Sequence, residues 1–301
     1  MKLTLTAERE AKLLSVLRSE LGMSSSLVGR LKYQGAFTVN GAPVFTNFIV
    51  RPGDCVEVRL DEPTPDYPAE NGPLDILYED EWLIALDKPS SILMHPSSAR
   101  NTGTLANFLI AYYRRTGQPS AVHPVSRLDR DTFGVVLLAK SSHVHAKMHA
   151  LQRTHGIEKR YEAAVLGIPP QPEGEIDAPI ARVEGSSLLR RVDPNGKPAV
   201  SRYRVLETAE IGGQPVSRLA LWPLTGRTHQ LRLHCAYLGC PILGDPQYAA
   251  PASAALSAAL GLSGQQLCAT ELRFLHPMTG AMTEIRTNQS IRLDFCHPPV
   301  V

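Results

Sequence analysis

The stretch RLDRDTFGVVLLAK, residues 127–140, is the most informative part of this chain. One acidic residue, Asp129, lies between Arg127 and Arg130, and an almost wholly apolar run follows Gly134. This run predicts a buried strand at residues 134–139. A carboxylate beside buried structure needs a cationic partner, because burial penalises its charged form. The stretch therefore predicts a sheet-containing fold in which a carboxylate that needs a cationic partner lies just before a buried strand.

The composition limits the class of protein. The chain has 301 residues, 43% hydrophobic and 20% charged, which fits a globular protein of one large domain or two. No apolar run approaches the ~18 residues of a membrane helix, and the charged start MKLTLTAEREAKLL does not fit a signal peptide. Five scattered cysteines without a C-x-x-C pair favour small buried side chains in a reducing, cytoplasmic setting over structural zinc.

Charge is unevenly distributed along the chain. Residues 1–60 hold eight Lys/Arg and five Asp/Glu, a balance of +3, whereas residues 61–81 hold eight Asp/Glu and no Lys/Arg. Since the whole chain has a formal charge of +2, residues 82–301 carry +7. Two mildly basic bodies joined by an acidic segment suit a polyanion such as RNA. Judged by charge alone, a chance asymmetry of solvated surface residues is about as good an explanation as binding to RNA.

The order of structural signals along the sequence also predicts two folded units joined by a linker. The acidic, Pro-rich segment DEPTPDYPAENGP at residues 61–73 indicates a linker. Before it, residues 11–20 have helical leucine spacing, and Ser24 or Ser25 can cap a second helix that stops near Gly35. A hairpin at Asn40-Gly41 and a strand at residues 55–60 complete this unit.

After the linker, strands alternate with fewer helices. No repeat, G-x-G-x-x-G or P-loop pattern occurs, so a nucleotide cofactor has no sequence signal. Expected strands lie at residues 76–78, 83–86, 134–139, 161–166, 201–206 and 217–222, and expected helices at 104–113, 143–154 and 228–238.

Several segments, in order, resemble the RluA-type pseudouridine synthases, and in particular an RluD-like subgroup. They are residues 76–96, 123–140 with Arg-Leu-Asp, 158–167, 196–207, 224–248 with T-G-R-T-H-Q-L-R, and 269–280. The resemblance implies an α/β (α+β) pseudouridine synthase fold with a mixed, largely antiparallel central sheet over residues 74–297. It also implies an RNA-modifying isomerase that needs no cofactor and no metal. Two positions depart from the family pattern, Ser126 where His is common and Phe133 where Ser is common.

The resemblance assigns roles to particular residues. It makes Asp129 the catalytic nucleophile or base, places Arg232 in a salt bridge with it, and stacks Tyr161 on the target uracil. Helical spacing puts Arg232 at the edge of an apolar stripe, where it can be partly buried. The remaining implied contacts are Leu272 near the base, Arg127 in the stack that the flipped uridine vacates, and Arg130 on phosphate. A core tyrosine, a core leucine and a locally paired surface arginine are the ordinary alternatives.

The N-terminal unit resembles a small RNA-binding module, the αL motif, of a ribosomal small-subunit protein. In that case Arg18, Arg30 and Lys32 contact phosphates, with Arg51 a further candidate. The alternative is a small α+β adaptor with ordinary surface charges. Large-subunit ribosomal RNA is the favoured substrate and transfer RNA the second, and we expect a monomer.

Two other functions compete with this interpretation. One is a non-catalytic RNA-binding or ribosome-assembly protein that kept the fold. The other is a glycosidase-type hydrolase, which would pair Asp129 with Asp131 or Asp245 as the second carboxylate. Three histidines, His123, His229 and His234, lack the spacing of a metal site.

Overall fold

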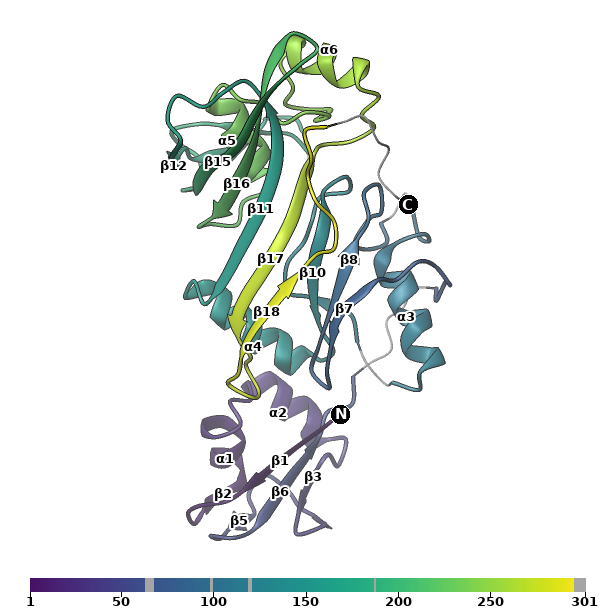
Figure 1. Ribbon diagram of the computed structural model, residues 1–301. Coiled ribbons are helices and arrows are strands. Elements are labelled where there is room, and N and C mark those ends of the chain that lie inside the picture. The colour runs from purple at the N-terminus through teal and green to yellow at the C-terminus, as the bar shows by residue number, and fades with distance from the viewer. Residues whose placement is uncertain (63–67, 98–99, 119–120, 187, 295–301) are drawn as a thin grey trace.

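The computed structural model describes residues 1–62, 68–97, 100–118, 121–186 and 188–294 (Figure 1). A small N-terminal body is joined to a larger one, and helix α2 of the small body faces helix α4 of the larger (Figure 1). The two bodies correspond to the units on either side of the acidic segment in the sequence.

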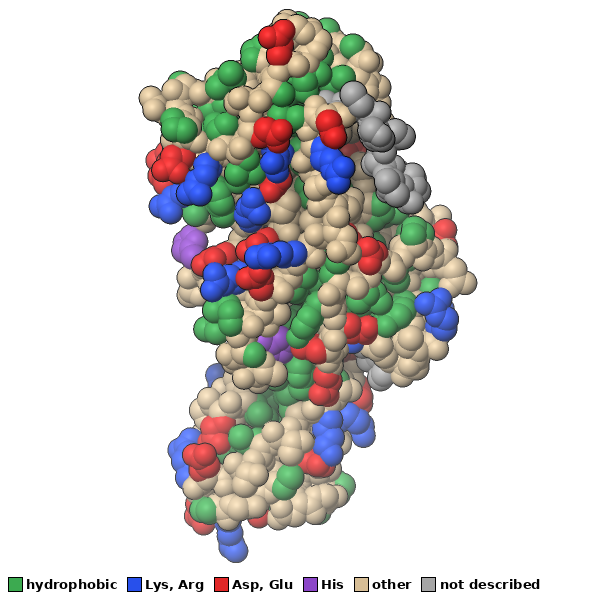
Figure 2. All heavy atoms as spheres, viewed as in Figure 1, with side chains coloured by type: hydrophobic (Ala, Val, Ile, Leu, Met, Phe, Trp, Pro, Cys, Tyr) green, Lys and Arg blue, Asp and Glu red, His purple; other side chains and the backbone are tan. Residues whose placement is uncertain are grey.

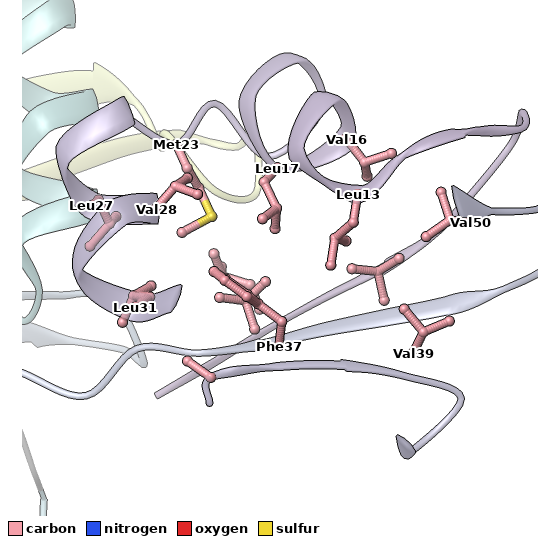
Figure 3. Close-up of a cluster of buried hydrophobic side chains, with 14 of the residues drawn as sticks. Leu13, Val16, Leu17, Met23, Leu27, Val28, Leu31, Phe37, Val39 and Val50 are labelled. Carbon is pink, nitrogen blue, oxygen red and sulfur yellow. The ribbon is translucent and has the colours of Figure 1, made fainter. Parts of the chain in front are cut away.

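The small body is a four-stranded sheet covered by two helices. The strand order is β1-β6-β3-β4, with every neighbouring pair antiparallel. Apolar side chains of both helices point onto the sheet around Phe37 and Val39 and form its core (Figure 3). Its elements are β1 (Lys2–Thr6), β2 (Ala11–Lys12), α1 (Leu13–Ser19), α2 (Ser25–Lys32), β3 (Phe37–Val39), β4 (Ala42–Pro43), β5 (Ile49–Val50) and β6 (Cys55–Arg59).

Local signals in this body are confirmed. The Ser24 hydroxyl accepts the backbone N–H of Leu27 at 3.2 Å and caps α2, as predicted. Asn40 and Gly41 both have positive φ, 51° and 80°, which is the geometry of a tight hairpin turn. Strand β1 was not predicted, because its five residues depend on pairing with β6 over fifty positions away.

The small body is packed against the larger one. Trp82 and Met278 of the larger body pack on the core of the small body. The side chain of Glu62 is only 3% exposed and accepts hydrogen bonds from the backbone N–H and hydroxyl of Ser142, at the start of α4. In the predicted linker, residues 63–67 lie outside the described part, and Glu70 accepts the Gly103 N–H at 2.6 Å. The described ends of the linker are therefore held by the larger body.

The larger body is built on a ten-stranded sheet with strand order β12-β15-β16-β11-β17-β10-β8-β7, to which β18 adds at β17 and β9 at β10. Among the described residues, every pairing between strands of this sheet is antiparallel except that of β10 with β17. The mixed, largely antiparallel sheet is thus confirmed. Its strands are β7 (Ile76–Glu79), β8 (Leu83–Lys88), β9 (His123–Pro124), β10 (Phe133–Ala139), β11 (Ile157–Leu166), β12 (Glu173–Asp177), β15 (Val200–Ile211), β16 (Gln214–Pro223), β17 (Leu267–Leu275) and β18 (Met282–Arg286).

Helices cover both faces of the sheet. Alternate residues of β10 face α3 on one side and α4 on the other, as the period of a strand requires. Helix α5 packs on the β11–β16 part through Leu231 and Cys235. The remaining elements are α3 (Leu105–Arg115), α4 (Ser142–Arg153), α5 (Gln230–Tyr237), α6 (Pro251–Ala259) and a separate hairpin of β13 (Ile180–Arg182) and β14 (Arg190–Val192).

The six strands and three helices expected after the linker are all present. The structure extends β15 to Ile211 and adds the strands β9, β12, β13, β14, β17 and β18 and the helix α6. Strand β17 pairs with β11, β10 and β18, so pairing with distant segments stabilises it more than any local pattern.

Gly134 is required where β10 meets β17. It has φ +100°, and a Cβ atom there would lie 2.3 Å from the carbonyl oxygen of Ala269. The parallel pairing of β10 with β17 therefore depends on the absence of a side chain. This contact fixes the start of β10, five residues after Asp129.

We predict that Gly134→Ala destabilises the protein far more than Gly167→Ala. Both glycines have a large positive φ, but a Cβ on Gly167 would make only ordinary contact, at 3.6 Å, with Cys240. The difference in the free energy of unfolding should be about 1–3 kcal/mol, the usual cost of overpacking. Urea denaturation of both variants measures it, and equal destabilisation would show that the close approach to Ala269 is unimportant.

Candidate active site

Asp129 lies in the loop between β9 and β10, and its side chain is 31% exposed. Lys88, at the end of β8, is 0% exposed beneath this loop. Its ammonium group donates hydrogen bonds to the backbone oxygens of Arg130 at 2.7 Å and Pro89 at 2.9 Å. A buried cation therefore supports the loop from below, a role that the sequence did not suggest.

Arg232 on α5 connects Asp129 to the rest of the site. Its Nη1 donates to Oδ2 of Asp129 at 3.1 Å, so the predicted ion pair is present. Its Nε and Nη2 each bond Asp245 at 2.7 Å, and Nη2 also donates to Gln247 at 2.9 Å. At 4% exposure, Arg232 is more deeply buried than its expected place at the edge of an apolar stripe.

Asp245 is itself fixed in a tight turn. Its Oδ1 accepts the backbone N–H groups of Gln247 and Tyr248 at 2.8 and 3.1 Å. Gly244 just before it has φ +73°, and a Cβ there would lie 2.1 Å from the carbonyl oxygen of Gly264. Burial alone would lower the pKa of Arg232, but hydrogen bonds and charges, from Asp245 first and then Asp129, raise it. The guanidinium is consequently a permanent cation in a fixed orientation.

Tyr161 on β11 packs between the apolar cluster under α3 and the cluster under α5. Burial, followed by the negative charge of Asp129, raises the pKa of its phenol well above the usual value. Within the described residues the Tyr161 hydroxyl has no hydrogen-bond partner. The site therefore contains a neutral phenol on an apolar floor close to Asp129.

His229 and Tyr248 belong to the site, although sequence reasoning assigned no role to either. His229 Nε2 is 3.8 Å from Asp129 Oδ2, and its Nδ1 is 2.7 Å from the Tyr248 hydroxyl. The Tyr248 ring lies under the Arg232 guanidinium, at 4.9 Å. The signal available in the sequence was proximity, since His229 immediately precedes α5 and lies three positions before Arg232.

The two arginines that flank Asp129 do not contact it. Arg130 forms a two-pronged ion pair with Asp131, with both N–O distances 2.9 Å. Arg127 is exposed and forms no hydrogen bond or ion pair in the described part of the chain. Arg130 is therefore partnered by a carboxylate in this structure, and Arg127 is available to a ligand.

Leu272 does not share the apolar cluster of Tyr161. Leu272 packs with Val144 and Met148 in the cluster under α4. Tyr161 instead packs with Ala269, and the β11–β17 register shifts between Arg160 and Tyr161. This packing fits the ordinary alternative, a core leucine, and a contact of Leu272 with the target base stays a prediction.

The carboxylates required by a hydrolase are both engaged. Asp131 is held by Arg130, and Asp245 by Arg232. A permanent cation at ion-pair distance stabilises the deprotonated form of a carboxyl group. Such a group is poorly suited to be the proton-donating acid of a hydrolase. Among the described residues, no group of His, Cys, Asp or Glu is placed to hold a metal ion.

The basic residues of the N-terminal body divide into two kinds. Arg18, Lys32 and Arg51 are exposed, and Lys32 adjoins the exposed ring of Tyr33. Arg30 instead points to the larger body, where it bonds the Ser142 hydroxyl at 3.2 Å and lies 3.6 Å from Glu62. The structure thus uses Arg30 to join the two bodies and leaves the other three facing solvent.

A cleft of about 1080 Å³ lies on the face of the sheet that α4 covers, and Asp129 is not part of its lining. Trp222 and Arg202 in this lining pair next to Leu221 and Tyr203, which pack under α5, so the cleft lies on the opposite face of the sheet from Tyr161 and α5. The cationic and aromatic side chains around it are His149, Arg153, His155, Lys159, Arg202, Tyr203, Arg204, Trp222 and Arg227. Its acidic residues Glu173 and Glu175 form ion pairs with Arg204 and Arg202, both at 3.1 Å.

Other charged surface is mostly neutralised. Figure 2 shows Lys and Arg interleaved with Asp and Glu across one face of the larger body. Ion pairs on the sheet include Arg218 with Glu162 at 2.9 Å and Arg286 with Glu271 at 3.0 Å. Such pairing leaves little net attraction for a polyanion on those strands.

Comparison with known proteins identifies the family. The RNA pseudouridylate synthase family matches residues 82–237, just over half of the chain. The chain belongs to this family. Its members are isomerases that act on RNA, so this protein is an RNA pseudouridine synthase.

Relatives share most of their length with this synthase. The uncharacterized RNA pseudouridine synthase YjbO of Bacillus subtilis is 36% identical over 86% of this chain and 89% of its own length. Ribosomal large subunit pseudouridine synthase D of Haemophilus influenzae is 35% identical over 77% and 72%.

Solved structures agree on the fold. Human RNA pseudouridylate synthase domain containing 1 has a TM-score of 0.61 at 26% identity, over 74% of this chain and 86% of that one. This supports the predicted pseudouridine synthase fold. In the described part of the synthase, no helix is long and apolar enough to cross a membrane.

We predict an alkaline stability component from Lys88. Burial lowers its pKa from 10.5 to about 8, against the opposing charges of Asp131 and Asp129. Between these two values the unfolded chain binds a proton that the folded protein has released, so the free energy of unfolding rises with pH. Below about pH 8 both states hold the proton and the component vanishes.

The measurement compares wild type with Lys88→Met by urea denaturation from about pH 7 to about pH 10, spanning the window that linkage sets. The stability advantage of the wild type should grow as the pH increases. An advantage that shrinks over this range would contradict burial as the dominant influence on Lys88.

Proposed function

We propose that this synthase isomerises specific uridines of ribosomal RNA in the cytoplasm, with Asp129 as its essential nucleophile or base. The observation that carries the proposal is the 3.1 Å contact of Asp129 with Arg232, whose orientation is fixed by Asp245. The contact provides an oriented anion that is partly open to solvent, beside the neutral phenol of Tyr161. These are the features that a reaction on a uridine inserted into the site requires.

The reaction rearranges one nucleoside without a net exchange of electrons. The N1–C1′ bond of uridine breaks, a C5–C1′ bond forms, C5 loses a proton and N1 gains one. A carboxylate can serve by attack on the sugar or by removal of a proton. Both routes need Asp129 to be charged, and the Arg232 cation favours that charge against the effect of burial.

The target uridine has to leave its stack to reach Asp129. Flipping a base costs a few kcal/mol, which contacts with the protein must offset. Tyr161 offers a ring for stacking on the uracil. Arg127, exposed beside Asp129, is positioned to fill the vacated place in the RNA.

We infer that the cleft on the α4 face and the N-terminal body supply surfaces for phosphate. The cleft combines Arg153, Arg227, Lys159 and Trp222, a mixture suited to RNA backbone and unstacked bases, whereas its other two arginines are paired with glutamates. On the N-terminal body, Arg18 in the last turn of α1 is exposed, and so are Lys32 and Tyr33 at the end of α2. We infer that this body adds affinity without taking part in the chemistry.

Ribosomal RNA is proposed because the Haemophilus relative is named for the large ribosomal subunit. The test is to compare pseudouridine maps of total RNA from cells with and without this protein. Loss of one or a few sites in large-subunit RNA would support the proposal. Loss of sites only in transfer RNA would replace it with the second candidate substrate.

Asp129→Asn should abolish pseudouridine formation and leave RNA binding largely intact, because it preserves shape and removes the charge. The matched control is Asp131→Asn, the same change two residues later, which should retain activity because Arg130 holds that carboxylate. Release of tritium from C5-labelled uridine in RNA gives the rate. Normal turnover by Asp129→Asn would show that Asp129 is not the essential nucleophile or base.

Salt dependence should distinguish the N-terminal arginines and lysine. Lys32→Gln should lower the slope of log affinity against log salt by roughly 0.7–0.9, the value of one phosphate contact. Arg30→Gln should leave the slope unchanged, because Arg30 faces Glu62 and Ser142. Filter binding at several salt concentrations measures both, and a larger change for Arg30→Gln would reverse our assignment of these residues.

A further inference from the structure

His229 is held in an unfavourable backbone conformation next to Asp129. It has φ 57° and ψ 21°, in the left-handed region that side chains other than Gly and Asn rarely adopt. It is the residue that precedes α5, and its side chain makes no capping hydrogen bond to the helix. Strain of this kind persists only where the surroundings impose it, and it is concentrated at functional sites.

The Tyr248 hydroxyl fixes the protonation pattern of the His229 ring. That hydroxyl accepts the backbone N–H of Arg190 at 3.2 Å and lies 2.7 Å from His229 Nδ1. If the phenol donates its own proton to Nδ1, every group is satisfied, and Nε2 carries the ring hydrogen. The opposite tautomer would leave the phenolic proton without an acceptor and direct the bare Nε2 lone pair at Asp129.

The ring hydrogen on Nε2 then points to the carboxylate. Nε2 is 3.8 Å from Asp129 Oδ2, the same oxygen that Arg232 contacts at 3.1 Å. The separation exceeds a normal hydrogen bond, but active-site contacts in a free enzyme are often long and shorten when substrate binds. A second donor on Oδ2 would leave the other oxygen, Oδ1, free to act on the substrate.

Burial favours the neutral form of the His229 ring. Burial lowers its pKa, and the cations Arg232 and Arg190 lower it further, against Asp129 and Asp245. A neutral ring at neutral pH is the form that the Tyr248 contact requires. His229 is thus suited to donate one hydrogen bond without neutralising Asp129 by a full ion pair.

We propose that His229, locked by Tyr248, is a positioning residue that donates its Nε2 hydrogen to Asp129 and orients that carboxylate for the chemical step. This inference rests on the proposed role of Asp129. It assigns to the Asp129 carboxylate two donors of different kinds, a cation that favours its charge and a neutral ring that sets its direction.

Two substitutions at His229 test whether a hydrogen-bond donor is needed at the position of Nε2. The side-chain amide of Gln places an N–H close to the Nε2 position, whereas the amide of Asn stops near Nδ1. Asn is also the side chain best tolerated in left-handed backbone, so His229→Asn should fold at least as well as His229→Gln. The pair therefore separates loss of the donor from backbone strain.

In single-turnover and steady-state assays, His229→Asn should lose about 10- to 100-fold in kcat, the factor for one hydrogen bond to a charged group, with KM nearly unchanged. His229→Gln should retain kcat within about threefold, since it keeps the donor of that bond. Equal losses for the two variants, or a better His229→Asn enzyme, would overturn the proposal.

Tyr248→Phe provides a second test, because it removes only the hydroxyl that fixes the tautomer. It should lower kcat less than His229→Asn does, again without a change in KM, and unchanged kcat would contradict the lock. Asp129→Asn assayed alongside separates the two levels of inference. An active Asp129→Asn enzyme refutes the proposed function, whereas an inactive one with fully active His229→Asn refutes only the role of His229.

Discussion

The active site of this synthase depends on one buried arginine. Arg232 is almost wholly removed from solvent, and taking a guanidinium out of water costs several kcal/mol unless its hydrogen-bonding groups are matched. Asp245 matches one edge with two bonds of 2.7 Å, and Asp129 matches the other edge at 3.1 Å. Because Asp245 fixes the plane of the guanidinium, the position of Asp129 follows from it. Charge and geometry at the reacting carboxylate thus have the same source.

The sheet brings these residues together from distant parts of the chain. The loop with Asp129 precedes β10, and Arg232 lies on a helix 103 positions later. Parallel pairing of β10 with β17 at Gly134 fixes one side, and packing of α5 on β11 and β16 fixes the other. Lys88 supports the loop from below through two backbone oxygens. The scaffold is therefore rigid where the carboxylate is held.

Local signals in the sequence predicted the elements well, because caps, turns and periodicity are local. The Ser24 cap, the Asn40-Gly41 turn and the buried strand after Asp129 are examples. The Asp129–Arg232 contact was also expected, from the family resemblance. Contacts between residues that are distant in the sequence were harder to predict. Arg30 faces the larger body, Leu272 lies in the cluster under α4, and His229 reaches Asp129, none of which helical or strand spacing specifies.

The central claim is that the shape of the Arg232 side chain, and not merely its positive charge, organises the site. Arg232→Lys tests it most directly, because lysine keeps the charge but cannot bond Asp245 with two prongs and reach Asp129 as well. The measurement is the single-turnover rate of pseudouridine formation, with unfolding monitored in parallel. The account predicts a folded enzyme slowed by about 100-fold or more, comparable to the loss of a preorganised donor. A folded Arg232→Lys enzyme with nearly normal rate would contradict it.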